Sequence, residues 1–264
     1  MPPLLIFLLV LFGLSIGSFL NVVIARLPKQ QSIVVPRSHC PDCGLSLHWY
    51  DNIPLLSYLL LGGHCRFCKK PISFRYPLVE LISGFLIFLL YLQFGDVKIV
   101  LLYFLFLASP LIAITFIDLS HKVIPNVISL PGIPAGLLVS LLIYGFQVEI
   151  LWRSLIGMAA GGGLLFLIAW LYEKLRRREG IGMGDVKLIT MLGAFLGWKG
   201  VFFVLMISSL LGSLTGLVMM VVSRKNLQYE IPYGPFLAAA ALLYLFIGQE
   251  MIHFYFEVTS HLYN

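Results

Sequence analysis

Two aspartates mark the ends of long apolar runs in a chain that otherwise keeps its charged residues out of such runs. Asp118 ends the run LASPLIAITFID, and Asp185 closes the string GMGD. An ionisable side chain near hydrocarbon depth is costly unless it is paired or hydrated, so it is a functional-site hypothesis by default. Two carboxylates brought together in a membrane predict one chemistry before others, which is activation of a water molecule by a pair that shares one proton.

The reaction that such a pair performs is aspartyl proteolysis. The ionised carboxylate takes a proton from water, which attacks a peptide carbonyl, while the protonated carboxyl polarises that carbonyl and protonates the leaving amine. Gly182 and Gly184 would let an extended substrate backbone approach Asp185 closely. The alternative interpretations are a helix N-cap for Asp185 and a solvated helix end for Asp118, with neighbouring basic side chains as counter-charges.

The four cysteines form a second constellation, Cys40-x2-Cys43 followed by Cys65-x2-Cys68. Two CxxC pairs at this separation are typical of a structural zinc site, because four thiolates complete a closed tetrahedron. A loop of about 50 residues has too small a core to fold securely alone, and a bound metal would stabilise it. The alternative is a thiol oxidoreductase, whose cysteines should reach an oxidising compartment. The charge distribution places these cysteines in the reducing cytoplasm, so the sequence predicts zinc.

The elements that position these residues are transmembrane helices. The chain has 264 residues, of which 59% are hydrophobic and 11% are charged, whereas a soluble domain carries about a quarter charged residues. The sequence therefore predicts an all-α polytopic membrane protein. The net charge of +6 does not indicate nucleic-acid binding, because the basic residues are spread over several short loops. Hydropathy predicts about eight spans, near residues 4–25, 77–94, 98–117, 127–146, 150–172, 184–198, 200–222 and 233–255.

The basic residues orient these spans. Nearly all lysines and arginines fall in loops on one side of the predicted bilayer, and the exceptions are Lys98, Arg153 and Lys199. Because basic loops stay in the cytoplasm, the loop 26–76 is expected to be cytoplasmic and both termini to face outward. Asp118 then ends an inward-running span, and Asp185 begins an outward-running one. Both carboxylates are therefore expected at the cytoplasmic edge of the bilayer, at similar depth.

These patterns divide the chain into three expected parts. They are a first transmembrane helix (1–25), a cytoplasmic zinc-binding domain (26–76) and a seven-helix membrane aspartyl peptidase domain (77–264).

A polar cluster is expected in the same leaflet as the two aspartates. Asn21 and Arg26 lie near the inner end of the first span, and Glu80 lies at the inner start of the second. Asn21 would suit a hydrogen bond between helices, and Arg26 would suit a topology anchor. Glu80 would pair with Arg26 or Arg75, or it would hold a cationic ligand.

Six motifs follow one another along nearly the whole chain: GSFLNVVIARLP (17–28), PRSHCPDCG (36–44), WYDNIPLLSYLLLGGHCRFCKKPISFRYPLVEL (49–81), FIDLSHKVIPNVISLPG (116–132), GIGMGDVKL (180–188) and IPYGPFLA (231–238). In this order and spacing they resemble the type IV prepilin peptidases. These are the bifunctional leader peptidases/N-methyltransferases of type IV pilus, type II secretion and competence systems. The family's catalytic aspartates map onto Asp118 and Asp185, and neither motif departs from the family pattern.

The resemblance implies a substrate and a second activity. The substrates would be prepilins and pseudopilins, cut after the leader glycine at the cytoplasmic face of the bacterial inner membrane, where the multi-pass enzyme lies among lipids. The new N-terminal residue, usually phenylalanine, would then be methylated from S-adenosylmethionine. Glu80, Asn21 and Arg26 are the candidates for this cofactor site, with the Glu80 carboxylate holding the substrate amine or the sulfonium cation. Orientation of amine and methyl donor would supply most of the rate.

Two alternatives remain at the sequence level. The first is a GxGD peptidase without methyl transfer, although the cysteine-bearing loop resembles the bifunctional members and not the shorter archaeal preflagellin peptidases. The second is a cation transporter that uses Asp118, Asp185 and Glu80 as ligands or as a proton relay. These acids would all lie at one surface, and the outer leaflet has no matching set of charges that would complete a path.

Overall fold

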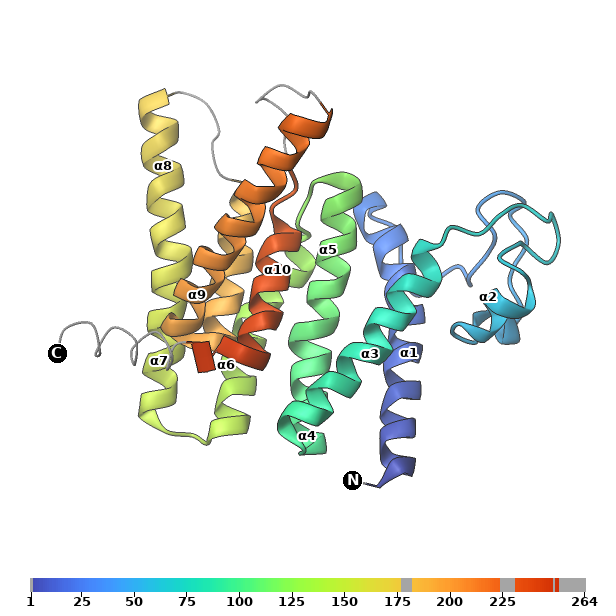
Figure 1. Cartoon of the computed structure of the whole chain (residues 1–264), viewed down its shortest axis with the longest axis horizontal. Helices are drawn as coiled ribbons and strands as arrows, with labels where there is room; N and C mark the ends of the chain where they lie inside the picture. Colours follow the sequence, from blue (N-terminus) through green and yellow to red (C-terminus); the bar gives the residue numbers. More distant parts are fainter. Residues whose placement is uncertain (1, 177–181, 224–230, 249, 252–264) are drawn as a thin grey trace. The chain divides into compact units, whose positions relative to one another are not determined.

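The computed structural model describes residues 2–176, 182–223, 231–248 and 250–251 (Figure 1). Within these ranges the regular secondary structure is helical, apart from isolated β-bridges in the cysteine-bearing loop. The chain divides into two compact units, Met1–Ile117 and Asp118–Asn264.

Six helices in the described ranges are long and apolar enough to cross a membrane. They cover Pro3–Lys29, Arg75–Phe94, Val97–His121, Asn126–Tyr144, Val148–Leu175 and Met183–Val222. A shorter apolar helix covers Gly234–Gly248. The predicted fold class, an all-α polytopic membrane protein with a small cysteine-bearing domain, is confirmed.

The first unit is built on a close pair of helices, α1 (Pro3–Arg26) and α3 (Arg75–Phe94). A Cβ atom added to Gly17 would lie 2.6 Å from the Cα atom of Glu80, so the two backbones touch at this point. Small residues permit such close approach between helices inside a membrane. The unit continues with α4 (Val97–Tyr103), the π-helical turn η3 (Phe104–Ala108) and most of α5 (Ser109–His121).

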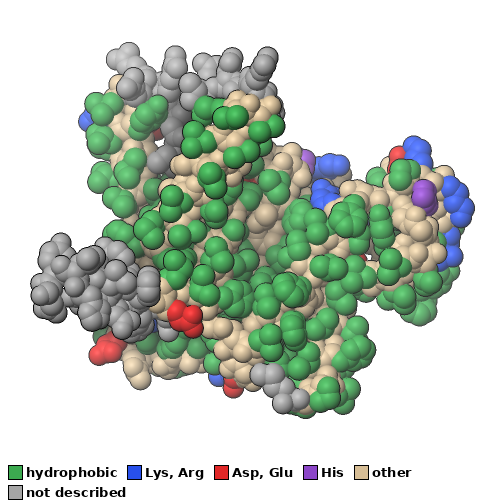
Figure 2. Space-filling view, in the orientation of Figure 1, with side chains coloured by type: hydrophobic (Ala, Val, Ile, Leu, Met, Phe, Trp, Pro, Cys, Tyr) green, Lys and Arg blue, Asp and Glu red, His purple; other side chains and the backbone are tan. Residues whose placement is uncertain are grey.

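The segment between α1 and α3 carries the four cysteines and only short helical elements. Figure 2 shows Lys, Arg and His side chains gathered over this segment, at the right of the view, whereas the visible helix surfaces are mostly hydrophobic. This contrast is expected where helices cross hydrocarbon and a loop domain lies in water. The short elements are η1 (Leu27–Lys29), η2 (Trp49–Asn52) and α2 (Leu56–Leu60).

The second unit is organised around its longest helix, α9 (Met183–Ser223). The hydroxyl of Ser140 donates to the carbonyl oxygen of Ala194 over 3.0 Å and so joins α6 to α9. In Figure 1, α7 and α8 form one long rod beside α9. The elements that contact α9 are α6 (Asn126–Tyr144), α7 (Val148–Met158), the π-helical turns η4 (Ala159–Gly163) and η5 (Tyr244–Gly248), α8 (Leu164–Arg176) and α10 (Gly234–Leu243).

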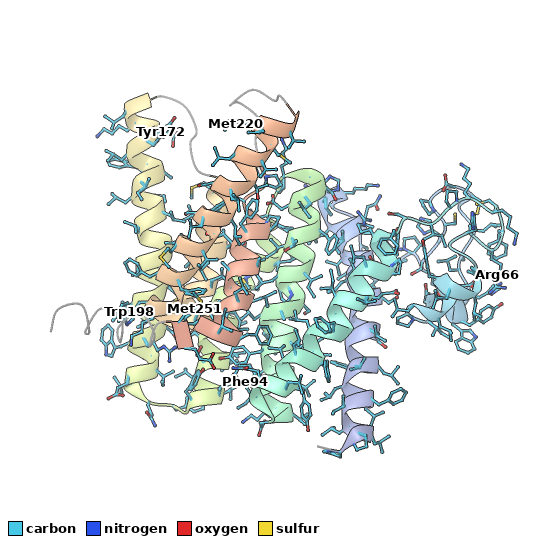
Figure 3. The ribbon with its side chains drawn as sticks, in the orientation of Figure 1. Arg66, Phe94, Tyr172, Trp198, Met220 and Met251 are labelled. Carbon is cyan, nitrogen blue, oxygen red and sulfur yellow. The ribbon has the colours of Figure 1, made fainter. Side chains whose placement is uncertain are left out.

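The predicted spans 184–198 and 200–222 form one element in the structure, broken by a glycine. Gly197 has a non-helical backbone inside α9 (φ 72°, ψ −179°), which glycine adopts without steric cost. Both ends of α9 lie toward the upper side of Figure 1, and Figure 3 places Trp198, directly after the break, at the lower side. The chain therefore turns back at Gly197. The last predicted span, 233–255, overlaps the shorter apolar helix and runs beyond the described residues.

Candidate functional site

Asp118 lies in the last turn of α5 and is buried, with 4% of its surface exposed. Its carboxylate oxygen Oδ2 accepts a hydrogen bond of 2.9 Å from the backbone N–H of Gly234, the first residue of α10. The N-terminus of a helix presents free N–H groups and a positive dipole end to an anion. The alternative of a solvated helix end does not fit this burial, and α10 fixes one oxygen of the carboxylate.

The glycine at position 234 is required by the closeness of this contact. A Cβ atom added there would lie 2.8 Å from Oδ2 of Asp118 and 3.3 Å from its carboxyl carbon. The sequence analysis did not identify Gly234 as a site residue. Its contribution is a backbone N–H, which every residue except proline carries, so the residue type alone gives no signal of the role.

Asp185 is half-buried in the first turn of α9. It is the third residue of the helix and therefore not its N-cap, and its N–H donates to the carbonyl oxygen of Gly182 over 3.0 Å. A Cβ atom on Gly182 would lie 3.2 Å from Oδ2 of Asp185. The exposed Gly182 thus keeps one side of the carboxylate uncovered.

The start of α9 packs against the chain that follows Asp118. A Cβ atom on Gly184 would lie 3.0 Å from the Cβ atom of Ile124, and the Lys187 ammonium donates to Oδ1 of Asn126 over 2.8 Å. These contacts place the start of α9, which carries Asp185, beside the segment that follows Asp118. Asp118 and Asp185, which are 67 positions apart in the chain, thus lie on neighbouring segments of the second unit.

The four cysteines converge in the first unit. Their sulfur atoms all lie within 4.8 Å of one another, and the group could hold a metal ion. The Sγ atoms of Cys40 and Cys68, one from each pair, are 3.8 Å apart. A tetrahedral zinc with zinc–sulfur bonds of about 2.3 Å separates its ligand sulfurs by roughly 3.8 Å. The donor set and its spacing therefore fit zinc.

Each cysteine pair lies in a turn of its own, and the two turns have the same hydrogen-bond pattern. The Gly44 N–H donates to the Cys40 carbonyl over 2.9 Å, and the Lys69 N–H donates to the Cys65 carbonyl over 3.1 Å. Gly44 and Lys69 both have a positive φ, 72° and 57°. The two turns are joined by an ion pair of 2.8 Å between Lys70 and Asp42, and Figure 3 shows Arg66 at the outer side of the same domain.

The thiols are placed to act as thiolates around a cation. Backbone N–H groups of Cys68 and Phe67 lower the pKa of Cys65 to about 7. At Cys68 the Lys70 N–H acts in the same direction, but burial and the neighbouring thiols outweigh it and raise the pKa to about 11. Thiolates this close repel one another, so the second ionisation is costly. A divalent cation would remove that cost.

The predicted cofactor residues all lie near the junction of α1 with α3 and the loop. Asn21 is buried, and its Nδ2 donates to the Tyr76 carbonyl over 3.0 Å. Its Oδ1 is buried with no hydrogen-bond partner in the described part of the chain. Arg26, also buried, donates to the carbonyl oxygens of Ser32 (3.1 Å) and Arg37 (3.3 Å).

Glu80 is bonded to the loop rather than to an arginine. Its Oε2 accepts the N–H of Leu55 over 2.8 Å, and its carboxylate interacts with the Ser18 hydroxyl. The ion pairs found among the described residues join Arg66 to Asp51 and Lys70 to Asp42. The pairing of Glu80 with Arg26 or Arg75 that the sequence suggested is therefore absent from the described structure.

Comparisons with known proteins cover both units. Residues 11–94 match the bacterial peptidase A24 N-terminal domain, and residues 105–217 match the type IV leader peptidase family. A prepilin leader peptidase/N-methyltransferase of Aeromonas hydrophila is 38% identical, over 97% of this chain and 95% of that protein. This chain belongs to the type IV leader peptidase family.

Two other relatives have a similar level of sequence identity to this chain. Relatives with the same name come from Burkholderia pseudomallei, at 39% identity over 90% of this chain and 84% of theirs, and from Myxococcus xanthus, at 43% identity over 85% of this chain. The match spans 65% of the length of the Myxococcus protein. No solved structure matches the chain.

Proposed function

We propose that this protein is a bifunctional prepilin-processing enzyme of the inner membrane. It cleaves the leader peptide of type IV prepilins and pseudopilins after the leader glycine, and it then methylates the new N-terminal residue with S-adenosylmethionine. The observation that carries the proteolytic half is the packing of the start of α9, which holds Asp185, against the segment that follows Asp118 at the end of α5. The names of relatives that are aligned over most of their length support both halves.

In the proposed cleavage step the two carboxylates share one proton. The ionised carboxylate takes a proton from a water molecule, and the water oxygen attacks the carbonyl carbon of the leader glycine. The protonated carboxyl polarises that carbonyl and then protonates the leaving amine. The N–H of Gly234 holds Oδ2 of Asp118 in place, and Gly182 leaves room beside Asp185 for an extended substrate.

The substrate chemistry agrees with a site at a membrane edge. A prepilin would present a basic leader in water and an apolar helix in lipid, with the scissile bond between them. Loop charges support a cytoplasmic site and outward-facing termini, although the termini lie outside the described residues. The cysteine cluster supports a structural zinc, which would hold the two turns of residues 40–44 and 65–69 together.

The test is mass spectrometry of a purified prepilin incubated with the purified protein, with and without S-adenosylmethionine. We expect loss of the leader mass, and the addition of one methyl group only when the donor is present. Asp118→Asn and Asp185→Asn should each lower the cleavage rate by roughly 10³-fold or more. Glu149→Gln, which changes an exposed carboxylate in α7, is the matched control.

Each contrary outcome would indicate a different function. Cleavage without methylation would reduce the function to a GxGD peptidase. An intact prepilin in every incubation would reject the proposal and leave the cation transporter.

A further inference from the structure

The cysteine-bearing loop of the first unit exposes a cluster of large apolar side chains. Trp49 is 80% exposed, Leu59 73% and Leu60 78%. Leu56 lies three and four positions before these two leucines in α2, so the three side chains share one face of the helix. An exposed apolar cluster marks a surface that contacts a protein or a membrane. We call it the α2 surface, and it consists of Trp49, Ile53, Leu56, Leu59 and Leu60.

The α2 surface carries no free charge. Within residues 49–63 the one charged residue is Asp51. The Asp51 side chain is 2% exposed and forms an ion pair of 2.8 Å with Arg66. Figure 2 shows hydrophobic side chains along the lower edge of this domain, and Lys and Arg side chains along its upper and outer edges. The domain therefore has an apolar side and a basic side.

Two hydrogen bonds fix the depth of the α2 surface along the membrane-crossing helices. The Ser18 hydroxyl donates to the carbonyl oxygen of Asn52 over 3.4 Å, and the Leu55 N–H donates to Oε2 of Glu80 over 2.8 Å. Ser18 lies about 12 Å before the end of α1, and Glu80 lies about 8 Å after the start of α3. In Figure 1, α2 accordingly lies beside α1 and α3 and not beyond their ends.

This depth lies within the hydrocarbon layer. The 24 residues of α1 extend over about 36 Å, whereas the hydrocarbon layer is about 30 Å thick. Only a few Å at each end of α1 then lie outside the layer, and Ser18 and Glu80 lie inside it. Backbone groups at such a depth need protein partners. The Asn52 carbonyl and the Leu55 N–H have such partners in these two side chains.

The α2 surface is also continuous with the apolar surface of α1. Trp49 and Val34 line a cavity of about 520 Å³ together with Phe19 of α1, which is 48% exposed. Arg26 and Arg37 line the same cavity, and its described lining contains no acidic residue. Arginines beside an apolar surface suit the boundary where lipid phosphates meet acyl chains.

We propose that the α2 surface is inserted into the lipid leaflet at the Arg26 end of α1. The apolar side of the cysteine-bearing domain then anchors the domain on the bilayer, and its basic side faces water. Elements that lie in a membrane interface bury their apolar face by about 5–10 Å, which agrees with the depth of Glu80 along α3. This contact goes beyond the proposed function and depends on neither catalytic activity. A second copy of the chain or a substrate helix would cover the same side chains, and the experiment separates both from lipid.

The experiment labels the full-length protein in vesicles of phosphatidylcholine and phosphatidylglycerol with two photoreactive probes. One probe is a phosphatidylcholine with an aryl diazirine on its acyl chain. The other is a water-soluble aryl diazirine sulfonate, present on both sides of the membrane. Mass spectrometry of the peptides locates the labels. We expect the lipid probe to label residues 49–60, and the water-soluble probe to label residues 64–70, which include the exposed Arg66, Lys69 and Lys70.

A charged variant of the α2 surface tests the same contact. Leu59→Asp combined with Leu60→Asp should lower lipid labelling of residues 49–60 by roughly 10-fold or more, because a charged side chain is costly in hydrocarbon. Both leucines are exposed, so the change does not open the core. Phe146→Asp changes an exposed ring between α6 and α7 and is the matched control, which should leave this labelling unchanged. Circular dichroism and gel filtration check the fold of each variant.

Three outcomes would overturn the proposal. Labelling of residues 49–60 by the water-soluble probe alone would place the α2 surface in water. If neither probe labelled these residues, protein would cover them, and cross-links between two copies would identify a dimer contact. Loss of the lipid label when prepilin is added to the Asp185→Asn variant would make this a substrate-binding surface. None of these outcomes bears on cleavage or methylation, which are measured separately.

Discussion

At the scale of single residues, a backbone N–H group of the second unit fixes the position of the Asp118 carboxylate. Oδ2 of Asp118 accepts a hydrogen bond from the N–H of Gly234. A side chain at position 234 would crowd the carboxyl group of Asp118. The glycine at this position therefore belongs to the positioning of Asp118 and not only to the start of α10.

We predict that Gly234→Ala lowers prepilin cleavage roughly 10- to 100-fold, because the new Cβ atom would displace a carboxylate whose position sets the rate. The rate of leader removal by purified protein measures the effect. Gly163→Ala is the control, since a Cβ atom there would meet nothing within 4 Å. Equal rates in the two variants would contradict a positioning role for Gly234.

At the scale of helices, the break in α9 depends on one residue. Gly197 has a φ of 72°, and a Cβ atom there would lie 2.6 Å from Cγ of Arg153, whose guanidinium donates to the Leu196 carbonyl over 3.3 Å. Arg153 therefore fills the space that a larger residue at 197 would need.

We predict that Gly197→Ala destabilises the protein by about 1–3 kcal/mol, since an L-residue is strained in this backbone region. Gly216→Ala, in the second segment of α9, would bring a Cβ atom to only 3.5 Å from Ile231. It should be neutral or stabilise by up to about 1 kcal/mol. Thermal unfolding in detergent measures both changes. If Gly216→Ala lowered the stability as much as Gly197→Ala does, backbone strain at position 197 would not be the cause of the loss.

The cysteine cluster gives a prediction for the loop domain. Purified protein should contain about one zinc per chain, and Cys65→Ser should lose it, because a closed site needs four ligands. Without the metal the two turns lose their common anchor, so limited proteolysis should cut within residues 27–74. Elemental analysis and the cleavage pattern measure both effects. A metal content unchanged by Cys65→Ser would contradict the four-thiolate site.

The helices could be predicted from the sequence more fully than their contacts. Apolar length locates the spans, and the spacing of the cysteines locates the metal-binding group, because both signals lie in residue type. The turn at Gly197 and the N–H of Gly234 could not be predicted in the same way. They depend on backbone conformation and on the approach of segments far apart in the chain, such as residues 118 and 234. The hydrogen bond from the Leu55 backbone to Glu80 could not be predicted for the same reason.

At the scale of the whole molecule, the distribution of charge predicts which loops face the cytoplasm. Gln147, between α6 and α7, should face outward, and Gln31, in the cysteine-bearing loop, should face inward. In intact spheroplasts a membrane-impermeant thiol reagent should label Gln147→Cys. It should label Gln31→Cys and the native cysteines only after permeabilisation. Labelling of both sites in intact cells would contradict this orientation.

The turn in α9 also sets the length of the first segment of this helix, and that length can be compared with the thickness of a membrane. The segment from Met183 to Leu196 has about 14 residues and so a length of about 21 Å, against a hydrocarbon layer of about 30 Å. We expect a helix this short to thin the bilayer around itself. Asp185 lies at one end of that segment, so a thinner bilayer would bring water, which peptide hydrolysis consumes, closer to its carboxylate. Lipid chain length is then a variable of the reaction, and bilayers of short-chain lipids should support faster cleavage than thick ones.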